Sequence, residues 1–448
     1  MDSPRSIEPE CSTAECSTAI LGGGPAGLAV GYYLSKLGIQ SHIVEAESTV
    51  GGACRTMEFA GVRYDLGAHR LHNVFPEVTQ ELRGLLGHDL AMVNVPSHIY
   101  HNDKPVPFPP SPLGLVRALG FWKVARSIAP LLTRTSRAAD NFRDDAVSKY
   151  GRCVAESFLI NFSEKLWGLP AEQLSVAVSG KRLQGLDART ALSGLLGRKH
   201  GEHLDGAFFY PRRGFGQITD ALAAHIRHIH TEARVAKLLH ANRRISEVVL
   251  SDGRRFSAQT VVCSLPVSSL VRMLDPEPPQ SILDLASTLR FRSVRLAIWV
   301  VKVSSVSRSA SLYFPRADVP FTRIYEPKRR SAAMAPADRT CLVVEYPVSE
   351  RDPIDTLPRD AFLAMSREAL LSTRLVSEDS LLEGTEQKIP NAYPVLDVGA
   401  ANRLTPVEAY LQRFTNLHRI GRTACFEYTH LHDLMRAGRR LAESLAPA

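Results

Sequence analysis

Residues 18–45 read TAILGGGPAGLAVGYYLSKLGIQSHIVE, and this stretch decides the fold. A short apolar run ends in a GxGxxG pattern formed by Gly22, Gly24 and Gly27. A helical pattern of apolar residues continues as far as Gly38, and a second short apolar run follows it. This order predicts a strand, a glycine loop, a helix and a second strand, in which the helix N-terminus faces the phosphates of a dinucleotide.

The residues of the glycine loop have separate expected roles. Gly22 allows a tight turn, Gly24 lets the backbone approach a pyrophosphate, and Gly27 lets the helix pack closely on the strand. Pro25 and Ala26 form the first helical turn between them, and we expect them to contact the cofactor as well.

Glu45 lies 21 residues after Gly24, at the end of the second strand. A carboxylate at this position accepts hydrogen bonds from ribose hydroxyls and would repel a 2′-phosphate. The alternative is a glycine turn that binds no nucleotide. The strand, helix, second strand and terminal acid are all in register here, which favours nucleotide binding.

A second glycine pair, Gly51-Gly52, follows the acid directly, and Arg55 comes three residues later. This segment resembles the GG-x-x-R segment that follows the acid in the flavin amine oxidase superfamily. The resemblance implies that its backbone and arginine contact the diphosphate and the ring edge of FAD. It also implies that the cofactor is FAD rather than NAD.

A further cofactor element is expected near the other end, where a strand-like run leads into Gly421 and Arg422 and then into a helix from about 432 to 445. A strand that ends in Gly-Arg before a helix N-terminus offers backbone donors to an anion or to a flavin carbonyl. The segment resembles the closing FAD motif of the same superfamily, which implies cofactor contacts for Gly421, Arg422 and His430. Val235 is also expected to contact the cofactor.

Motifs in the middle of the chain extend this resemblance over about residues 17–446. LGAHRLH at 66–72 is similar to the histidine loop of the UDP-galactopyranose mutases and their protoporphyrinogen-oxidase-like relatives. KLWG at 165–168, FRS at 291–293 and PFTR at 320–323 resemble further segments of these flavoproteins. Together the motifs are typical of the superfamily, but they do not identify the reaction.

The resemblance implies an α/β fold. It consists of a Rossmann-like FAD-binding domain of the glutathione-reductase type and a substrate domain of helices plus an antiparallel sheet. We expect a disordered tail at 1–16. The expected domain bounds are 17–75, 205–275 and 400–446 for the discontinuous FAD-binding domain, and 76–204 and 276–399 for the substrate domain.

Within these bounds, the pattern of 76–200 is mostly helical apart from a proline-rich loop at 105–112. Residues 251–253 read Ser-Asp-Gly and predict a hairpin turn. Residues 289–350 are strand-rich and predict an antiparallel sheet that floors the substrate site. Residues 357–385 have a helical pattern.

The histidine loop is expected to meet the flavin. By the resemblance, Gly67 and Ala68 allow close backbone approach, His69 lies against the isoalloxazine, and His72 faces the substrate or supports the loop. A histidine titrates near neutrality and can donate to a flavin or to a substrate oxygen. The alternatives are ordinary loop histidines and a metal site, and the glycine-rich setting without a carboxylate–histidine cluster argues against a metal.

Four further residues are expected to bind substrate. By the resemblance, Trp167 stacks on a planar group such as uracil, and Arg292 clamps a diphosphate. Arg323 and Tyr428 are placed at the substrate as well. A tryptophan packed in the core remains the alternative for Trp167.

Two reactions fit these residues. In the first, the protein is an oxidoreductase in which FAD accepts hydride from a small-molecule substrate. His69 and Tyr210 would assist proton removal, and Arg292 would belong to the catalytic site. The strand-like run at 290–301 contains three arginines and no lysine, which argues against an amine oxidase in the narrow sense.

In the second reaction, the protein is a nucleotide-sugar mutase in which reduced flavin attacks the anomeric carbon. The histidine loop, Trp167 and Arg292 support this hypothesis. Against it, FEYTHLHD at 426–433 replaces the tyrosine-rich segment of the mutases, and Arg70 is more typical of the oxidoreductase relatives, so the oxidoreductase is favoured. A third alternative, a non-catalytic binding protein on the same fold, is disfavoured by the intact glycine–arginine elements.

The composition sets further limits. The net charge is +8 and the pI about 9.2, but no basic stripe with interleaved aromatic residues occurs, which disfavours nucleic-acid binding. Seven cysteines without a CxxC pattern predict reduced thiols in the cytoplasm, with no zinc site or disulfide framework. The first residues are polar, which argues against a secretory signal. The sequence contains no run of about 18 apolar residues, so it does not predict a membrane span.

The apolar and basic segment at 113–132 has two open interpretations. One is contact with a membrane surface. The other is a helix that covers the substrate site or packs in the core, and this is favoured because such stripes are usually core.

Overall fold

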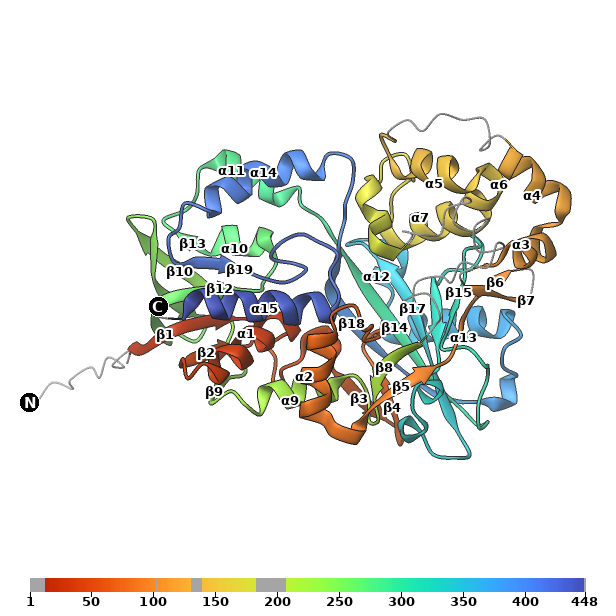
Figure 1. The fold of residues 1–448 in the computed structure, drawn as a ribbon, viewed down its shortest axis with the longest axis horizontal. Coiled ribbons are helices and arrows are strands. Elements are labelled where there is room, and N and C mark those ends of the chain that lie inside the picture. Colours follow the sequence, from red (N-terminus) through yellow and green to blue (C-terminus); the bar gives the residue numbers. More distant parts are fainter. Residues whose placement is uncertain (1–12, 102–103, 109, 130–138, 183–206, 447–448) are drawn as a thin grey trace, which may run out of the picture. The chain divides into compact units, whose positions relative to one another are not determined.

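The computed structural model describes residues 13–101, 104–108, 110–129, 139–182 and 207–446 (Figure 1). The chain divides into two compact units, each a mixed α/β structure with its own sheet. Unit 1 comprises Met1–Gly52, Leu222–Thr288 and Leu404–Ala448, and unit 2 comprises Ala53–Ala221 and Leu289–Arg403. Residues 53–75 and 207–221, which were expected in the FAD-binding domain, cluster with unit 2 by their contacts. The domain bounds remain a prediction.

Unit 1 is built on a parallel sheet that begins with the expected strand–helix–strand unit. β1 (Thr13–Leu21) pairs with β2 (Ser41–Val44) on one side and with β12 (Arg255–Cys263) on the other. β9 (His228–His230) pairs with β2, and β19 (Leu417–Arg419) pairs with β12. All four pairings are parallel, so the carboxyl ends of these strands meet at one edge, where open α/β sheets bind their ligands.

β1 begins at Thr13, which corrects part of the disordered tail expected at 1–16. Residues 13–16 pair in register with 255–258 of β12. The backbone hydrogen bonds of this distant partner favour an extended conformation that the polar composition of the segment does not reveal. Residues 1–12 lie outside the described part of the chain.

α1 (Pro25–Lys36) connects β1 to β2 and runs beside α15 (Leu431–Leu445), as Figure 1 shows. Residues Ala26 to Leu34 of α1 are all buried, because the helix has packing partners on every side. Gly438 of α15 permits the close approach, since a Cβ there would lie 2.9 Å from the Cβ of Ala29.

An antiparallel extension completes the sheet of unit 1. β11 (Arg244–Leu250) pairs with β12 across residues 251–254, which confirms the expected hairpin. β10 (Val235–Ala241) and β13 (Leu274–Asp275) follow β11. The remaining helices are α10 (Val267–Met273), α11 (Gln280–Ser287) and α14 (Ala400–Leu411), the last of which begins in unit 2.

Unit 2 contains a seven-stranded sheet in the order β18-β14-β17-β16-β15-β6-β7, which confirms the antiparallel sheet expected within 289–350. The β15–β6 pairing alone is parallel. The strands are β18 (Leu381–Pro394), β14 (Phe291–Val301), β17 (Thr340–Val348), β16 (Arg323–Tyr325), β15 (Ser311–Tyr313), β6 (Ser97–His101) and β7 (Lys104–Phe108).

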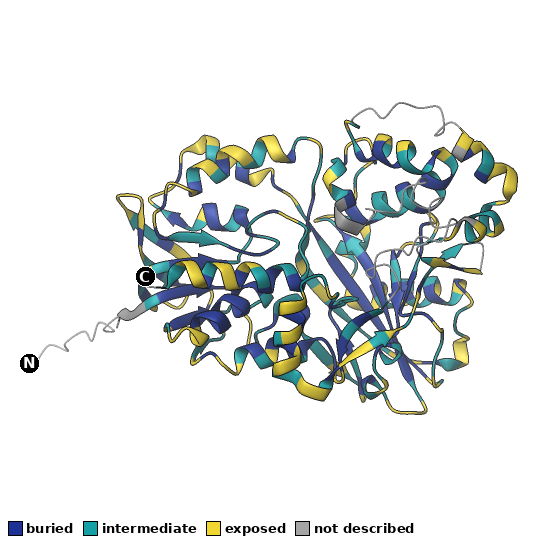
Figure 2. Cartoon of the chain, in the orientation of Figure 1, coloured by how far each residue is buried: buried dark blue, intermediate teal, exposed yellow. Residues whose placement is uncertain are grey.

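β14 is buried along almost its whole length, because both faces of the sheet are covered (Figure 2). Trp299 and its alternate neighbours pack with α13 (Arg359–Ser372) on one face. Ile298 and its alternate neighbours pack with Tyr64 of β4 (Val62–Asp65) on the other. The sheet therefore fixes β4, and the histidine loop begins where β4 ends.

The region 76–200 is less helical than its pattern indicated. β5 (Leu90–Asn94), β6 and β7 interrupt the helices, and β7 contains Pro105 and Pro107 of the expected proline-rich loop. β7 is an edge strand, where a proline removes no hydrogen bond to a further strand. α13 ends at Ser372 and β18 follows, so the helix expected over 357–385 is shorter.

Two ribbons and the remaining helices complete unit 2. The ribbons pair β3 (Thr56–Phe59) with β4, and β5 with β8 (Ala207–Pro211). The helices are α2 (Pro76–Leu86), α3 (Pro112–Leu119), α4 (Phe121–Ile128), α5 (Phe142–Tyr150), α6 (Arg152–Val154), α7 (Asn161–Trp167), α9 (Gly216–Ala223) and α12 (Pro353–Thr356).

Candidate cofactor site and histidine loop

Two glycine segments meet at the carboxyl edge of the parallel sheet in unit 1. The amide of Gly51 donates to the carbonyl of Gly23 at 2.8 Å. A Cβ on Gly52 would lie 3.1 Å from the Cα of Gly24. The second glycine pair thus lies directly on the first loop, and its positive φ angles (104° and 51°) are those that glycine adopts readily.

A third segment reaches the same place from the other end of the chain. Gly421 has a φ of 99°, and a Cβ on it would lie 2.9 Å from the Cβ of Ala26 in the first turn of α1. Ser264, directly after β12, donates to the carbonyl of Leu21 (2.9 Å) and accepts at its own carbonyl from Thr423 (3.0 Å). These contacts hold the ends of β1, β12 and β19 together.

The N-terminus of α1 fits an anionic ligand. Gly24 is the N-cap, no acid lies in the first turn, and no described atom comes within 4 Å of where a Cβ on Gly24 would be. At Gly27, in contrast, a Cβ would overlap with the carbonyl of Gly22, so loop and helix are in close contact there. Open space in front of amides without intrahelical partners fits the pyrophosphate of a dinucleotide.

The Glu45 carboxylate lies over the glycine loop, as expected for a ribose acceptor. Its oxygens accept from the amides of Gly23 (2.7 Å) and Glu47 (2.9 Å) and keep further lone pairs for hydroxyl donors. The Glu45 carbonyl accepts from the amide of Ala233 at 2.8 Å. The segment that leads into Val235 therefore runs beside the acid.

Unit 1 also brings together Arg422, Tyr428 and His430. The Arg422 guanidinium lies 4.9 Å from the ring centroid of Tyr428 and donates to the carbonyl of Thr429 (2.7 Å). The side chain of His430 caps α15, and the backbone amide of His430 donates to the carboxylate of Asp433 at 3.0 Å. The closing segment is thus ordered by its own contacts, and its roles toward cofactor and substrate remain predictions.

In unit 2, backbone pairing fixes the histidine loop at both ends. The amide of Leu66 donates to the carbonyl of Arg55 at 3.1 Å. Leu71 exchanges two backbone hydrogen bonds with Phe209 of β8 (2.8 and 3.2 Å). The backbone of Arg55 is thereby tied to the start of the loop.

The His69 imidazole is folded against its own loop. Its Nε2 lies 2.7 Å from the carbonyl oxygen of Ala53, and its ring stacks on Phe215 at a centroid distance of 5.1 Å. A Cβ on Gly67 would lie 2.9 Å from this Nε2, so glycine makes room for the ring. A carbonyl partner requires a hydrogen on Nε2, which leaves the lone pair of the neutral ring on Nδ1. Ala68 and His72, which belong to the same loop, are half-buried.

A buried carboxylate that we did not predict lies at the end of β4. Asp65 has no exposed surface and accepts from Thr56 (2.7 Å), the amide of Phe215 (2.9 Å) and the hydroxyl of Tyr210 (2.5 Å). Burial raises the pKa of Asp65, and these donors oppose that shift. A usable signal was present in VRYDLG, where one acid follows an alternating strand and precedes the loop.

Tyr210 is buried and hydrogen-bonded to Asp65, with 1% of its surface exposed. Burial raises its pKa well above the usual value, and the Asp65 charge adds to the shift. These observations do not support the proton-removing role that we expected for Tyr210.

Arg330 joins this network to the histidine loop. Its guanidinium donates to the carbonyl of His69 (3.2 Å) and to the hydroxyl of Ser311 (3.2 Å), and it lies 4.8 Å from the ring centroid of Tyr325. Arg330 is 4% exposed, so these contacts are shielded from water. None of the sequence motifs contains Arg330.

Arg292, expected to clamp a diphosphate, is engaged entirely by the protein. Its five N–H donors are directed to the carbonyls of Lys165, Leu166 and Pro347, to the hydroxyl of Ser349 and to the carboxylate of Asp352. The residue is 4% exposed. With no donor left over, the geometry does not support a substrate or catalytic role for Arg292.

Trp167 and Arg323 also have partners within the protein. Trp167 is 3% exposed and meets Tyr393 edge-on at 6.0 Å, which matches the core alternative rather than a stacking platform. Arg323 forms a bidentate pair with Glu345, with two contacts of 2.8 Å. The pair leaves one nitrogen of Arg323 outside it, so substrate contact by this residue remains a prediction.

Among the residues that the structure describes, no group of three or more His, Cys, Asp or Glu side chains is arranged to hold a metal. In the same part of the chain, no helix is long and apolar enough to cross a membrane.

Solved structures with the same fold cover nearly the whole chain. A reduced UDP-galactopyranose mutase aligns with 96% of this chain and 93% of its own at 19% identity, with a TM-score of 0.84. A protoporphyrinogen-oxidase-like protein from Exiguobacterium sp. 255-15 (97% and 99% covered, 17% identity) has a TM-score of 0.75. Putrescine oxidase bound to putrescine (97% and 99% covered, 18% identity) has a TM-score of 0.64. At these identities the likeness shows the fold.

Sequence comparison identifies the family. Protoporphyrinogen oxidase 2 (chloroplastic/mitochondrial) of Arabidopsis thaliana is 27% identical over 140 residues, which are 30% of this chain and 28% of that protein. The chain thus aligns with less than a third of this relative. The model of the flavin-containing amine oxidoreductases matches residues 25–305, well over half of the chain. The chain therefore belongs to the flavin-containing amine oxidoreductase family and is an FAD-dependent flavoenzyme.

Proposed function

We propose that the protein is an oxidoreductase that removes hydride from a small organic substrate, with bound FAD supplying the acceptor. The observation that carries this proposal is the burial of Trp167 and Arg292. These two side chains were the main support for a nucleotide-sugar mutase, and both have protein partners. The histidine loop that remains is a feature of the oxidoreductase relatives as well.

In this proposal, unit 1 binds the nucleotide part of the cofactor. The first turn of α1, with Gly24, receives the pyrophosphate, and Glu45 accepts from the ribose hydroxyls. Gly421 and Arg422 add donors from the closing segment. We keep Arg55, Val235 and His430 as further proposed cofactor contacts.

Unit 2 supplies His69 for proton removal. Oxidation of an alcohol or an amine by hydride removal also requires a base that takes the proton from oxygen or nitrogen. With Nε2–H held by the carbonyl of Ala53, the His69 lone pair is on Nδ1 and can take that proton. We keep His72, Arg323 and Tyr428 as proposed substrate contacts.

The location of the protein is part of the same proposal. Within the described part of the chain, Cys153, Cys263, Cys341 and Cys425 form no disulfide, which supports a reducing compartment such as the cytoplasm. A substrate that carries a nucleotide diphosphate remains the alternative in case the mutase hypothesis holds.

The test is an anaerobic reduction experiment with the purified yellow protein. We expect at least one member of a panel of amines, alcohols and desaturable compounds to bleach the flavin. His69→Gln should slow the bleaching about 100-fold or more with unchanged FAD content, because the base is lost. His72→Gln is the matched control on the same loop and should have a smaller effect.

The mutase alternative is tested on the same preparation with UDP-galactofuranose, once oxidised and once reduced with dithionite. Conversion to UDP-galactopyranose only after reduction would overturn the oxidoreductase proposal. Bleaching by a substrate, with no conversion in either state, would support it.

A further inference from the structure

We propose that α3 and α4 form a docking surface for an anionic lipid membrane. This surface, called here the α3–α4 surface, consists of Leu113, Phe121, Trp122, Arg117, Lys123 and Arg126. It shares no residue with the cofactor site or the histidine loop, so the proposal is independent of the reaction.

Three large apolar side chains of the α3–α4 surface are exposed to solvent. Trp122 is 77% exposed, Phe121 61% and Leu113 59%. Phe121 and Trp122 contact each other edge-on, with ring centroids 5.3 Å apart. Single exposed apolar residues are ordinary, but three on one helical hairpin indicate an interaction site.

The fold does not need these side chains, because the opposite faces of both helices are already anchored. Leu115 and Leu119 of α3 pack with the core cluster that contains Phe158. Val124 and Ser127 of α4 are buried. The hydroxyl of Ser127 accepts from the amides of Cys153 (2.9 Å) and Val154 (3.3 Å). The outward apolar residues are thus held in place without a described partner in the core.

The two helices and the sequence around them carry charges of one sign only. Residues 104–139 contain six Lys or Arg and no Asp or Glu, in a chain whose net charge is +8. Arg117, Lys123 and Arg126 are exposed on the two helices. Aromatic side chains beside cations are typical of helices that lie in the membrane interface, where rings enter the headgroup region and cations meet anionic phosphates.

Other partners fit this surface less well. A nucleic acid would engage the cations but would leave the adjacent apolar residues Leu113, Phe121 and Trp122 unused. A second copy of the chain would place two cationic surfaces against each other, and like charges oppose that contact. An anionic bilayer complements both the apolar and the basic part.

Trp122 provides a direct readout of docking. The chain has three tryptophans, and the other two, Trp167 and Trp299, are only 3% and 6% exposed. The holoprotein is mixed with vesicles of phosphatidylcholine, with or without about 30% phosphatidylglycerol. We expect blue-shifted emission and quenching by brominated lipid only with the anionic vesicles, and both effects should weaken as salt is added.

Substitutions on this surface separate the apolar and the electrostatic contributions. Phe121→Ala/Trp122→Ala should lower vesicle binding in flotation at least about tenfold. Lys123→Glu/Arg126→Glu should also lower it at least about tenfold, since each cation contributes about fivefold. Trp122→Phe should keep binding in flotation but lose the emission shift. Flavin absorbance shows that each variant retains its fold and cofactor.

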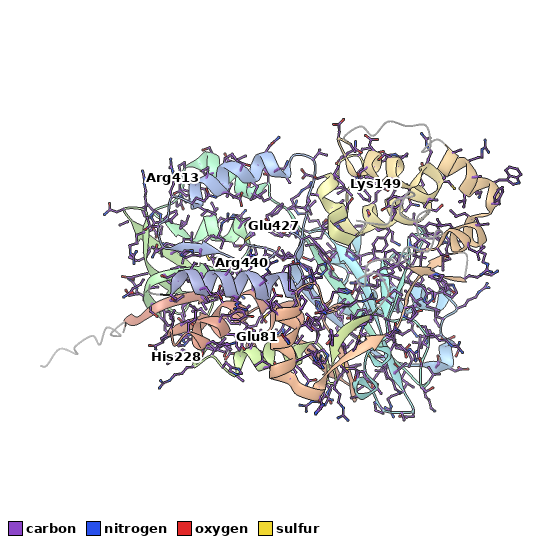
Figure 3. The ribbon with its side chains drawn as sticks, viewed as in Figure 1. Glu81, Lys149, His228, Arg413, Glu427 and Arg440 are labelled. Carbon is purple, nitrogen blue, oxygen red and sulfur yellow. The ribbon has the colours of Figure 1, made fainter. Side chains whose placement is uncertain are left out.

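Arg413→Glu/Arg440→Glu is the matched control, because it reverses two exposed cations of unit 1 that Figure 3 labels. This control should bind vesicles almost as the wild type does. The proposal is overturned if wild-type protein fails to bind anionic vesicles, if it binds neutral ones equally, or if the double-alanine variant binds unchanged. It is also overturned if the control loses binding as the Lys123/Arg126 variant does. A lipid-free dimer that dissociates in the double-alanine variant would assign the surface to a second copy instead.

Discussion

Arg292 shows that the protein itself can occupy every donor of an arginine in a recognisable motif. Its guanidinium holds the carbonyls of Lys165 and Leu166, and Gly168 leaves the space, since a Cβ there would lie 2.5 Å from the guanidinium. The KLWG and FRS segments are therefore two sides of one contact. Burial lowers the pKa of Arg292, and Asp352 opposes that shift. A buried cation of this kind is stable only while its acceptors surround it.

Arg292→Lys is expected to lower the free energy of unfolding by about 3 kcal/mol or more. An ammonium group cannot reach the five acceptors, and buried carbonyls such as that of Pro347 lose their donor. Thermal unfolding of the holoprotein measures this. Arg290→Lys, at an exposed position just before β14, should stay within about 0.5 kcal/mol. A variant that keeps the wild-type Tm and only binds substrate more weakly would contradict the structural role.

Lys165 is expected to make stability depend on pH above neutrality. Its ammonium donates to the carbonyls of Phe314 (2.7 Å) and Arg316 (2.9 Å), and burial lowers its pKa to about 7. The neutral amine keeps two N–H groups, enough for both carbonyls. From about pH 7 up to the unfolded pKa of 10.5, the unfolded chain binds a proton that the folded chain has lost. The free energy of unfolding should therefore rise with pH, by at most about 1.4 kcal/mol per unit.

Lys165→Met should remove this rise, because only the wild type has the titrating amine. Urea unfolding at several pH values between 7 and 9.5 gives the two slopes. Lys149→Met is the control, since the side chain of Lys149, labelled in Figure 3, is 41% exposed and pairs with Asp145. Parallel slopes for wild type and Lys165→Met would show that Lys165 titrates alike in the folded and unfolded chain.

At the scale of elements, the sequence predicts the helices, strands and turns whose own residues contain an apolar run or a turn signal. The strand–helix–strand unit, the hairpin at 251–253 and the buried strand β14 all have apolar runs or turn residues of their own. β5 was missed because it is mostly exposed and is completed by β8, more than 100 residues later. The strand at 13–16 was missed because β12 supplies its partner. The burial of Trp167 could not be predicted either, since it depends on contacts with distant segments.

Substitution by alanine should have different effects at two glycines of the same loop: Gly27→Ala should lower stability, and Gly24→Ala should lower FAD affinity. Gly27→Ala should lower the free energy of unfolding by about 3 kcal/mol or more, because its Cβ would overlap with the Gly22 carbonyl. Gly24→Ala should leave the Tm of the apoprotein almost unchanged, because the space around it is open. Its Cβ would nevertheless enter the volume proposed for the pyrophosphate, so FAD binding should weaken about tenfold to 100-fold.

Calorimetric titration of apoprotein with FAD and thermal unfolding separate these two effects. Gly84→Ala, in the middle of α2 with open space around it, is the control. It should leave FAD affinity unchanged and raise stability by about 0.5–1 kcal/mol. Wild-type affinity in Gly24→Ala would show that the pyrophosphate lies elsewhere.

At the scale of the whole molecule, the cofactor site is assembled from distant parts of the chain. Residues 22–27, 51–52 and 421 converge in unit 1, although unit 2 segments separate residue 421 from the other two in sequence. Their glycines have a local signature, so the meeting of these segments was predictable from the sequence. The substrate side was not, because burial by the sheet of unit 2 decides which polar residues remain available, as Asp65 and Arg292 show.

Because these three segments meet in one place, we expect FAD to protect all of them from amide hydrogen exchange together. In hydrogen–deuterium exchange of the apoprotein, added FAD should slow amide exchange in 22–28, 50–52 and 420–424. The slowing should reach about 100-fold at a free FAD concentration of 100 times Kd, where exchange proceeds through the unbound state. Residues 113–128 of the α3–α4 hairpin, which take no part in the site, serve as an internal reference. Gly24→Ala at the same FAD concentration should lower the slowing to about 2- to 11-fold in all three segments at once, whereas a reduction confined to the first segment would contradict a shared site.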